Sequence, residues 1–364
     1  MEMLYEIALT LVPGVGDVLA RRLIAHCGSA EAVFKEKKQH LMQIQGVGEF
    51  VANNILRNNY TERAAKEIEF TEKYKIRILY YQQTDYPSRL RHCNDAPIII
   101  YYKGTASLNP RYCLSIVGTR RATDYGREYI SRLMDYLRNY EVLIVSGLAF
   151  GIDTAAHKSA LECGLPTVAV LGHGLDRIYP SQNRPLAKRM LENGGLLSDF
   201  PSGTGPDREN FPKRNRIIAG LADATLVIET GLRGGSLITA DIANSYNRDV
   251  FALPGRFGDP MSEGCNWLIR TNRAALLDSP EVLAQEMGWA SPDQKNAPTQ
   301  KKLFVDLSPD ETRVVEILQT LGTASIDRIC IDSQLPATRV AAALLNLELN
   351  GLLRCMPGKI YKLT

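Results

Sequence analysis

The stretch Ser115-Ile116-Val117-Gly118-Thr119-Arg120-Arg121 decides the fold of this chain, because an apolar run gives way there to a glycine and two cations. The apolar part is typical of a buried strand, and a helical pattern begins near Tyr125. A strand, a glycine turn and a helix in this order present backbone N–H groups to a phosphate at the helix N-terminus. We therefore expect a phosphate site here, formed by Gly118, Thr119, Arg120 and Arg121.

Apolar runs of strand length recur through the central part of the chain, with helical patterns between most of them. The runs cover residues 114–117, 142–145, 167–171, 196–200, 224–228 and 250–253. Strands that are apolar throughout are buried on both faces, and their alternation with helices predicts a mostly parallel, doubly wound α/β sheet. Such sheets bind ligands at the C-terminal ends of their strands, which is where the glycine motifs of this chain fall.

A second motif, Phe211-Pro212-Lys213-Arg214-Asn215-Arg216, combines an aromatic ring with three cations. Proteins bind single-stranded nucleic acid with this combination, because bases stack on rings while cations contact the phosphates. The alternative is that Phe211 anchors the core and the cations cover a solvated helix start, which Pro212 would suit. Together with the phosphate motif, the segment favours a ligand that is a phosphate polymer with stackable bases.

Two further glycine loops follow predicted strands. Gly147 ends the second strand and permits close approach of another backbone, while His157 in the following helix is expected to pack rather than to catalyse. The loop Gly231-Leu232-Arg233-Gly234-Gly235-Ser236 opens a helix. It predicts a second phosphate cradle, with Gly235 and Ser236 as its contributors.

Several site classes find no support in the sequence. It contains no G-x-G-x-x-G fingerprint and no G-x-x-x-x-G-K-[ST] loop, and its seven cysteines form no C-x-x-C pair. We therefore expect no catalytic residue, no metal and no cofactor. An enzyme remains the alternative, because Glu229 before the glycine loop, with Asp241 nearby, superficially resembles nucleotide-processing hydrolases of a related Rossmann-like fold.

The composition is that of an ordinary globular protein, with 45% hydrophobic and 23% charged residues. A net charge of +3 permits nucleic-acid binding without arguing for it, so a basic site must be local. The first residues lack a basic signal-peptide region, and no run of about 18 apolar residues occurs. With an odd number of cysteines, this pattern predicts a cytoplasmic protein without a membrane span.

The two ends of the chain carry separate patterns. Leu11–Ala20 resembles Ile44–Ala52, which predicts a helix-hairpin-helix pair. Asp17 and Glu49 in its turns would repel phosphate, so DNA contact and protein contact both stay open. We expect a helix-hairpin-helix domain over residues 1–75, an α/β domain over 76–287, a linker over 288–304 and a winged helix over 305–364.

The winged helix invites the interpretation that Thr338 and Arg339 contact the major groove of a duplex. Residues 305–364 contain seven acidic and six basic side chains, however, and so carry no cationic excess. Protein contact or support of an oligomer is the favoured role for this region, and duplex binding stays an alternative.

These motifs, in this order, resemble the DprA/Smf family of DNA-processing proteins of bacterial natural transformation. The resemblance is carried by Ile116–Arg120, Ser146–Asp153, Phe211–Gly220, Gly235–Ala240 and Gly264–Asn266. It implies an extended Rossmann-like core that binds single-stranded DNA in a basic pocket, with a SAM-like helix-hairpin-helix domain before it and a winged helix after it. It also implies a homodimer that recruits RecA and loads it on incoming DNA.

The resemblance further assigns roles to individual residues. Arg120 would hold a phosphate together with the backbone of Gly118 and Thr119, and Phe211 would provide a stacking ring. The pocket would be lined by Lys213, Arg214 and Arg216, and the site would include Arg121, Gly147, Asn215, Gly235 and Ser236. The chain departs from the family pattern at Asp199 and Thr230, where Glu and Ala are expected.

Overall fold

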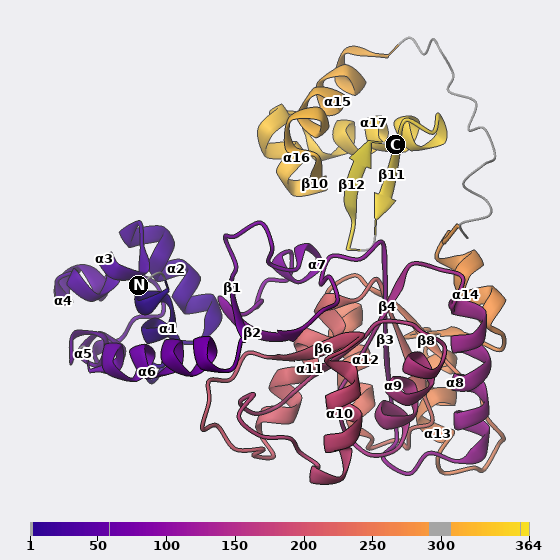
Figure 1. Ribbon diagram of the computed structural model, residues 1–364. Helices are drawn as coiled ribbons and strands as arrows, with labels where there is room; N and C mark the ends of the chain where they lie inside the picture. The colour runs from indigo at the N-terminus through magenta and orange to yellow at the C-terminus, as the bar shows by residue number, and fades with distance from the viewer. Residues whose placement is uncertain (1–2, 58, 291–306, 357, 364) are drawn as a thin grey trace.

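The computed structural model describes residues 3–57, 59–290, 307–356 and 358–363 of the chain. Figure 1 shows a group of N-terminal helices, a central α/β core and a small C-terminal unit of helices and strands. None of the helices in the described residues is long and apolar enough to cross a membrane.

The core is built on a nine-stranded sheet in the order β1-β2-β6-β5-β4-β3-β7-β8-β9. The strands from β6 to β9 in this order pair in parallel, whereas β2 is antiparallel to β6 and to β1. The sheet confirms the predicted α/β fold, and every residue of β4, β5, β6 and β7 is buried. The strands are β1 (Arg77–Tyr80), β2 (Ile99–Gly104), β3 (Tyr112–Gly118), β4 (Val142–Ser146), β5 (Thr167–Val170), β6 (Gly194–Ser198), β7 (Ala224–Ile228), β8 (Asp249–Ala252) and β9 (Ala275–Leu276).

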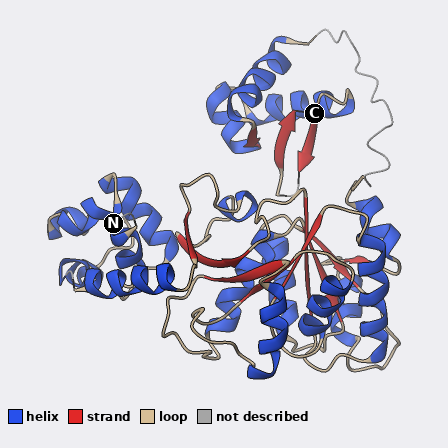
Figure 2. Cartoon of the chain, in the orientation of Figure 1, coloured by secondary structure: helices blue, strands red, loops and turns tan. Residues whose placement is uncertain are grey.

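Helices cover both faces of this sheet (Figure 2). One face buries its apolar side chains against α7 (Ser88–Arg91), α11 (Asn210–Leu221), α12 (Gly235–Ser245) and α13 (Glu263–Arg270). The other face packs against α8 (Asp124–Leu137), α9 (Ile152–Glu162), α10 (Arg184–Met190) and α14 (Pro280–Glu286). The sheet is therefore closed to water on both sides, and ligands have access to its edges and strand ends.

The strand order reverses at β3. The chain runs from β3 outward through β4, β5 and β6, and then returns to place β7 on the other side of β3, with Gly118 opposite Ile228. Ligands of open α/β sheets bind in the crevice at the C-terminal strand ends where this reversal occurs. The topology thus locates the expected site at the ends of β3, β4 and β7.

The N-terminal helices form two hairpins, each with a glycine in the left-handed region at its turn. Gly14 has φ of 88° and Gly46 has φ of 95°, which favours glycine at both positions. Their apolar cluster continues into side chains of β1 and β2, so these helices pack on one end of the central sheet. The helices are α1 (Leu4–Thr10), α2 (Asp17–Cys27), α3 (Ala30–Lys35), α4 (Lys38–Leu41), α5 (Glu49–Arg57) and α6 (Tyr60–Lys73).

The C-terminal unit confirms the predicted winged helix. Three helices pack on a three-stranded sheet in the order β10-β12-β11, and Ser308 and Glu311 form the expected capping box. Its elements are α15 (Pro309–Leu321), β10 (Thr323–Ser325), α16 (Ile326–Ser333), α17 (Ala337–Leu349), β11 (Leu353–Met356) and β12 (Ile360–Leu363). Most of the predicted linker lies outside the described residues, and Trp289 near its start stacks on Tyr112 of the core.

Candidate nucleic-acid interface

A hollow of about 490 Å³ opens at the carboxyl ends of β3 and β7. Three of the motifs singled out in the sequence meet in it, although they are far apart along the chain. They are the turn after β3 with Gly118, Thr119 and Arg120, the start of α11 with Phe211, Arg214 and Asn215, and the glycine loop before α12 with Gly235 and Ser236. The structure therefore brings together eight of the twelve predicted site residues.

The lining of the hollow is strongly cationic. It includes four arginines, of which Arg120, Arg208 and Arg233 are exposed, and Asp153 is the carboxylate among the lining residues. None of these three exposed arginines has an ion-pair partner in the part of the chain that the structure describes. Unpaired cations in a concave surface create a positive potential that attracts and retains phosphates.

Two of these arginines were not predicted as site residues. Arg233 lies within the glycine loop Gly231–Ser236, which was predicted to cradle a phosphate. A cation inside such a loop could have identified Arg233 as a site residue. Arg208 lies two residues before α11 in a stretch without a motif, and only the tertiary structure brings it to the hollow.

Arg214 is the fourth arginine and lies at the floor of the site. Its residue is 6% exposed, and its Nε and Nη1 atoms have no hydrogen-bond partner among the described residues. Burial lowers the pKa of Arg214, while the nearby charge of Asp153 opposes this effect. Burial likewise raises the pKa of Asp153 despite the adjacent guanidinium. Unpartnered buried donors are unfavourable, so Arg214 is a buried cation with unused hydrogen-bonding capacity beside the hollow.

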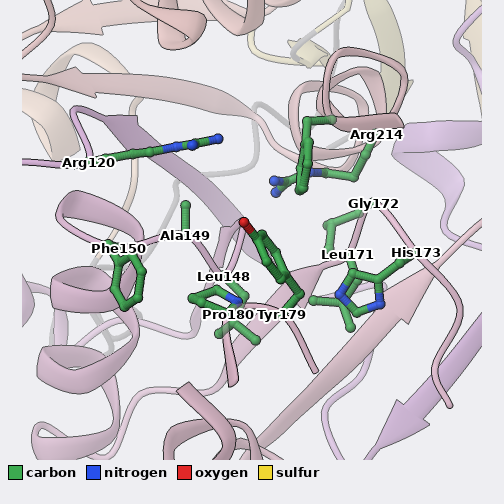
Figure 3. Close-up of a pocket in the computed structure, with 12 residues that line it drawn as sticks. Arg120, Leu148, Ala149, Phe150, Leu171, Gly172, His173, Tyr179, Pro180 and Arg214 are labelled. Atoms are coloured by element: carbon green, nitrogen blue, oxygen red, sulfur yellow. The ribbon is translucent and has the colours of Figure 1, made fainter. Parts of the chain in front are cut away.

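A small apolar pocket of about 40 Å³ adjoins the hollow and shares Arg120, Phe211 and Arg214 with it. The rings of Phe211 and Tyr179 lie 6.1 Å apart between centroids, and the Arg120 guanidinium lies 6.0 Å from the Phe211 ring centroid. Figure 3 shows Arg120 and Arg214 extending toward one another above Tyr179. Aromatic rings and cations therefore line the same opening, and this combination is typical of sites that bind single-stranded nucleic acid.

The turn after β3 is held by the neighbouring strand. The Thr119 amide donates to the Glu229 carbonyl at 2.6 Å, and the Thr119 carbonyl accepts from Ile152 at 3.1 Å. A Cβ on Gly118 would lie 1.9 Å from the Ile228 carbonyl oxygen, so only glycine fits there. The Thr119 N–H is thus engaged within the protein and is not free to donate to a phosphate, contrary to the expectation for this amide.

Gly147 lies beneath the site rather than in its lining. A Cβ at this position would be 2.1 Å from Nη1 of Arg214 and 2.4 Å from a carboxylate oxygen of Asp153. Its carbonyl contacts Nε2 of His157, whose Nδ1 lies 2.6 Å from the Thr167 hydroxyl. Burial lowers the pKa of His157 to about 4, so the imidazole is neutral at pH 7 and packs, as the sequence predicted. Glycine at 147 therefore makes room for Arg214.

Arg216 points away from the hollow. Its Nη2 pairs with Asp199 at 2.7 Å and with Asp17 of α2 at 2.8 Å, and its Nη1 donates to the Asp95 carbonyl. Burial opposes the charge of Arg216, but the carboxylates of Asp199 and Asp17 raise its pKa. The arginine expected to line the pocket instead joins the N-terminal helices to the core. Asp17, expected only to repel phosphate, is its partner.

Lys213 and Arg121 also lie outside the lining of the hollow, and both are exposed. Each has a neighbour in the sequence that does line it, so they flank the site at its rim. Their charges can contribute to the field around the mouth of the hollow without direct contact with a ligand on its floor.

The glycine loop before α12 is fixed by hydroxyl groups. Ser236 is buried and its hydroxyl donates to the Thr230 hydroxyl at 2.7 Å. A Cβ on Gly234 would lie 2.0 Å from that same Thr230 oxygen, whereas a Cβ on Gly235 would meet no atom within 4 Å. Gly235 is therefore the open position of the loop, at the N-terminus of an 11-residue helix.

The carboxylates that suggested a hydrolase do not line this hollow. Glu229 is buried, and its carboxylate accepts hydrogen bonds from the backbone and the hydroxyl of Thr123. Asp241 pairs with Arg273 at 2.8 Å on the surface. Within the described residues, no group of three or more His, Cys, Asp or Glu side chains is arranged to hold a metal ion.

The winged helix differs from the hollow in its electrostatics. Arg339, at the start of the helix that would enter a major groove, forms a two-point ion pair with Asp310 at 2.6 and 2.7 Å. The side chain of Arg339 is thereby directed to its own domain. This pairing agrees with the interpretation that duplex reading is not the favoured role of the winged helix.

The chain is thus an α/β protein with an arginine-rich hollow at the point where its strand order reverses. Comparisons with known proteins give its family. Residues 77–288 match the family described as DNA recombination-mediator protein A, and residues 296–359 match the DprA winged helix domain. The chain belongs to the DprA/Smf family of DNA-processing proteins.

Relatives cover most of the chain. The Smf protein of Synechocystis is 34% identical over 99% of this chain and 98% of its own length. The Smf protein of Escherichia coli is 38% identical over 76% of this chain and 75% of its own. The crystal structure of DprA from Streptococcus pneumoniae matches with a TM-score of 0.67 at 34% identity, over 78% of this chain and 97% of that one.

A second solved structure is that of a DprA protein described by its ligand. DprA from Helicobacter pylori, described for its single-stranded DNA-binding mode, matches with a TM-score of 0.53 at 28% identity. The match covers 58% of this chain and 95% of that chain. The fold and the family thus agree with the expectations that the motifs raised.

Proposed function

We propose that this chain binds single-stranded DNA in the arginine-rich hollow and acts as a recombination mediator. The observation that carries the proposal is the set of arginines without ion-pair partners, Arg120, Arg208 and Arg233, around the buried Arg214. The adjoining rings of Phe211 and Tyr179 supply stacking surfaces. The single-stranded DNA-binding relative from Helicobacter pylori supports the same ligand.

Binding would proceed through phosphates first and bases second. Arg120, Arg208 and Arg233 would attract the strand, and a phosphate that reaches the floor would accept hydrogen bonds from Arg214. A flanking base would stack near Phe211, where Arg120 already lies over the ring. Stacking and phosphate contacts read little sequence, so we expect weak sequence preference and strong dependence on salt.

The cellular role follows from the family. We propose that a homodimer of this chain protects incoming DNA in the cytoplasm, recruits RecA and loads it on the strand during natural transformation. This role needs no catalytic residue, metal or cofactor. We assign the winged helix to protein contact, on the basis of the Arg339–Asp310 pair and the balanced charge of residues 305–364.

Fluorescence anisotropy of a labelled oligothymidine tests the proposed DNA site. The wild type should bind the single strand more tightly than a matched duplex, and Arg120→Ala should weaken binding by about tenfold to a hundredfold. Arg189→Ala removes an exposed arginine of α10 that has no ion-pair partner in the described residues, and it should bind like the wild type. A duplex preference that does not depend on Arg120 would contradict the proposal.

The mediator role needs its own assay. With strand coated by single-strand-binding protein, the wild type should shorten the lag before RecA assembles, and Arg120→Ala should lose this effect in proportion to its DNA affinity. If the wild type binds the strand but leaves the lag unchanged, the result would contradict the RecA-loading role without contradicting the DNA site.

A further inference from the structure

A groove of about 380 Å³ runs between α8 and α9, outside the hollow. α8 lines it with Arg127, Ile130 and Ser131, and α9 lines it with Thr154, Lys158 and Ser159 among others. None of the sequence motifs assigned to the phosphate site covers these positions. The groove is a separate surface on the face of the sheet that carries α8, α9, α10 and α14.

The groove is continuous with the proposed DNA site through one aromatic residue. Phe150 lines both the groove and the small apolar pocket, and that pocket shares Arg120 with the hollow. The Phe150 residue is 46% exposed, although it is a large apolar side chain. Figure 3 shows its ring on the opposite side of the pocket from His173. A strand that leaves the hollow past Arg120 therefore meets an exposed ring before it enters the groove.

The charges of the groove suit a phosphate chain. Lys158 is exposed and has no ion-pair partner among the residues that the structure describes, and it lies about 9 Å along α9 from the start of the helix. Arg127 is exposed, and its ion-pair partner among the described residues is Asp124, through one contact of 2.8 Å. Unlike the two-point pair of Arg339, an exposed one-point pair contributes little. Ser131 and Ser159 add hydroxyl donors. Glu162 is the carboxylate among the lining residues.

We propose that the groove between α8 and α9 carries the continuation of the single strand beyond the hollow, with Phe150 as a stacking platform at the junction and Lys158 and Arg127 as phosphate contacts. The inference rests on the proposed function, because it takes the hollow as the first part of the same path. The groove lengthens the binding site, so its contribution grows with the length of the bound strand.

The test measures affinity as a function of strand length in the full chain. Oligothymidines from about 4 to about 30 nucleotides span the site sizes of about 4 to 16 nucleotides that single-strand-binding OB folds cover. The double variant Lys158→Ala/Arg127→Ala should bind the longest strand about tenfold more weakly than the wild type and the shortest within about twofold. Its salt dependence with the long strand should become shallower by about 0.7 per lost phosphate contact.

Matched variants separate this effect from a general change of charge. Lys188→Ala/Arg189→Ala removes two exposed cations of α10 and should leave the affinity at every length unchanged. Phe150→Leu keeps an apolar side chain without a ring, and it should weaken long strands more than short ones. Thermal unfolding of each variant should match the wild type, because these side chains are exposed.

Two outcomes would overturn the inference. In the first, Lys158→Ala/Arg127→Ala lowers the affinity for oligothymidine by the same factor at every strand length. In the second, it lowers the affinity no more than the control pair Lys188→Ala/Arg189→Ala does. These outcomes differ from those expected if the hollow does not bind DNA. In that case, Arg120→Ala would bind even the shortest strand as tightly as the wild type. A groove that instead holds a protein partner would leave the length dependence of DNA binding intact, which also contradicts the inference.

Discussion

The hollow at the strand ends and the winged helix are two of the parts of this chain for which the sequence raised DNA binding, and their arginines have opposite surroundings. In the hollow, Arg120, Arg208 and Arg233 lack ion-pair partners among the described residues. In the winged helix, Arg339 is held by both carboxylate oxygens of Asp310. A basic residue in a motif is therefore not enough to mark a phosphate site, because the structure decides whether the charge is still available.

The same contrast occurs within one helix. Arg214 and Arg216 are two residues apart on α11, which places them about 200° apart around the helix axis. Arg214 lines the hollow and has two buried donors without a hydrogen-bond partner among the described residues, whereas Arg216 is paired with Asp199 and Asp17. The charge of Arg216 is therefore used within the fold, and that of Arg214 is not.

The paired arginine should show the largest effect on stability. Arg216→Ala leaves Asp199 buried without its partner, and removal of one member of a buried pair costs about 3 kcal/mol of the free energy of unfolding. Denaturant unfolding measures this value. Lys213→Ala, on the exposed side of the same helix, should change it by less than about 0.5 kcal/mol. Equal effects of the two variants would remove the distinction between paired and unpaired cations on α11.

An unpaired arginine should affect binding and not stability. Arg233→Ala, in the glycine loop, should lower affinity for single-stranded DNA by about tenfold, since a charge-assisted contact contributes about 1.5 kcal/mol or more. The melting temperature should stay that of the wild type. Anisotropy and thermal scans on the same preparation check both parts. A large drop in melting temperature would show that Arg233 supports the loop.

The buried imidazole beneath the hollow should make stability depend on pH. The unfolded chain binds a proton at His157 near pH 6.5, whereas the folded chain binds it only near pH 4. The contribution of the neutral His157 to the free energy of unfolding is therefore fully present above pH 6.5 and is lost as pH falls toward 4. The free energy of unfolding should fall by about 2 kcal/mol between pH 7 and pH 4.5 for this reason. In His157→Gln, denaturant midpoints should change less over this interval than in the wild type. Parallel profiles would contradict a neutral buried His157.

The smallest effect is expected in the winged helix. Arg339→Ala breaks only the exposed pair with Asp310, so affinities for single-stranded and duplex DNA should stay within about twofold of the wild type. The same anisotropy titrations measure both. A strong loss of duplex binding would reverse the comparison and give the winged helix the DNA-binding role.

The fold, and the edge of the sheet where the glycine motifs converge, followed from the sequence for physical reasons. Apolar runs such as 224–228 predict buried strands because no polar side chain interrupts them, and the glycine motifs fell at the strand ends, where sheets of this class bind ligands. The turn after β3 and the glycine loop before α12 were for this reason predicted to lie at the same edge of the sheet, whereas the start of α11 was predicted as part of the site from its aromatic and basic residues.

The orientation of single side chains was harder to predict. Helical periodicity predicts that Arg214 and Arg216 lie on opposite sides of α11. It does not show which of them is paired, because the partner Asp17 lies 199 residues from Arg216 in the sequence. Nor does a sequence pattern show that the Thr119 amide bonds to the Glu229 carbonyl, or that Arg208 reaches the hollow. These contacts depend on how separate elements pack, and local patterns carry no information about them.

The salt dependence of single-strand binding tests the central claim most directly. Each phosphate contact in a single strand contributes about −0.7 to the slope of log affinity against log salt. We predict a steep slope for the wild type and a slope shallower by about 0.7 for Arg120→Ala, with Arg189→Ala unchanged. An Arg120→Ala slope equal to that of the wild type would mean that Arg120 contacts no phosphate, and that the hollow is not the DNA site.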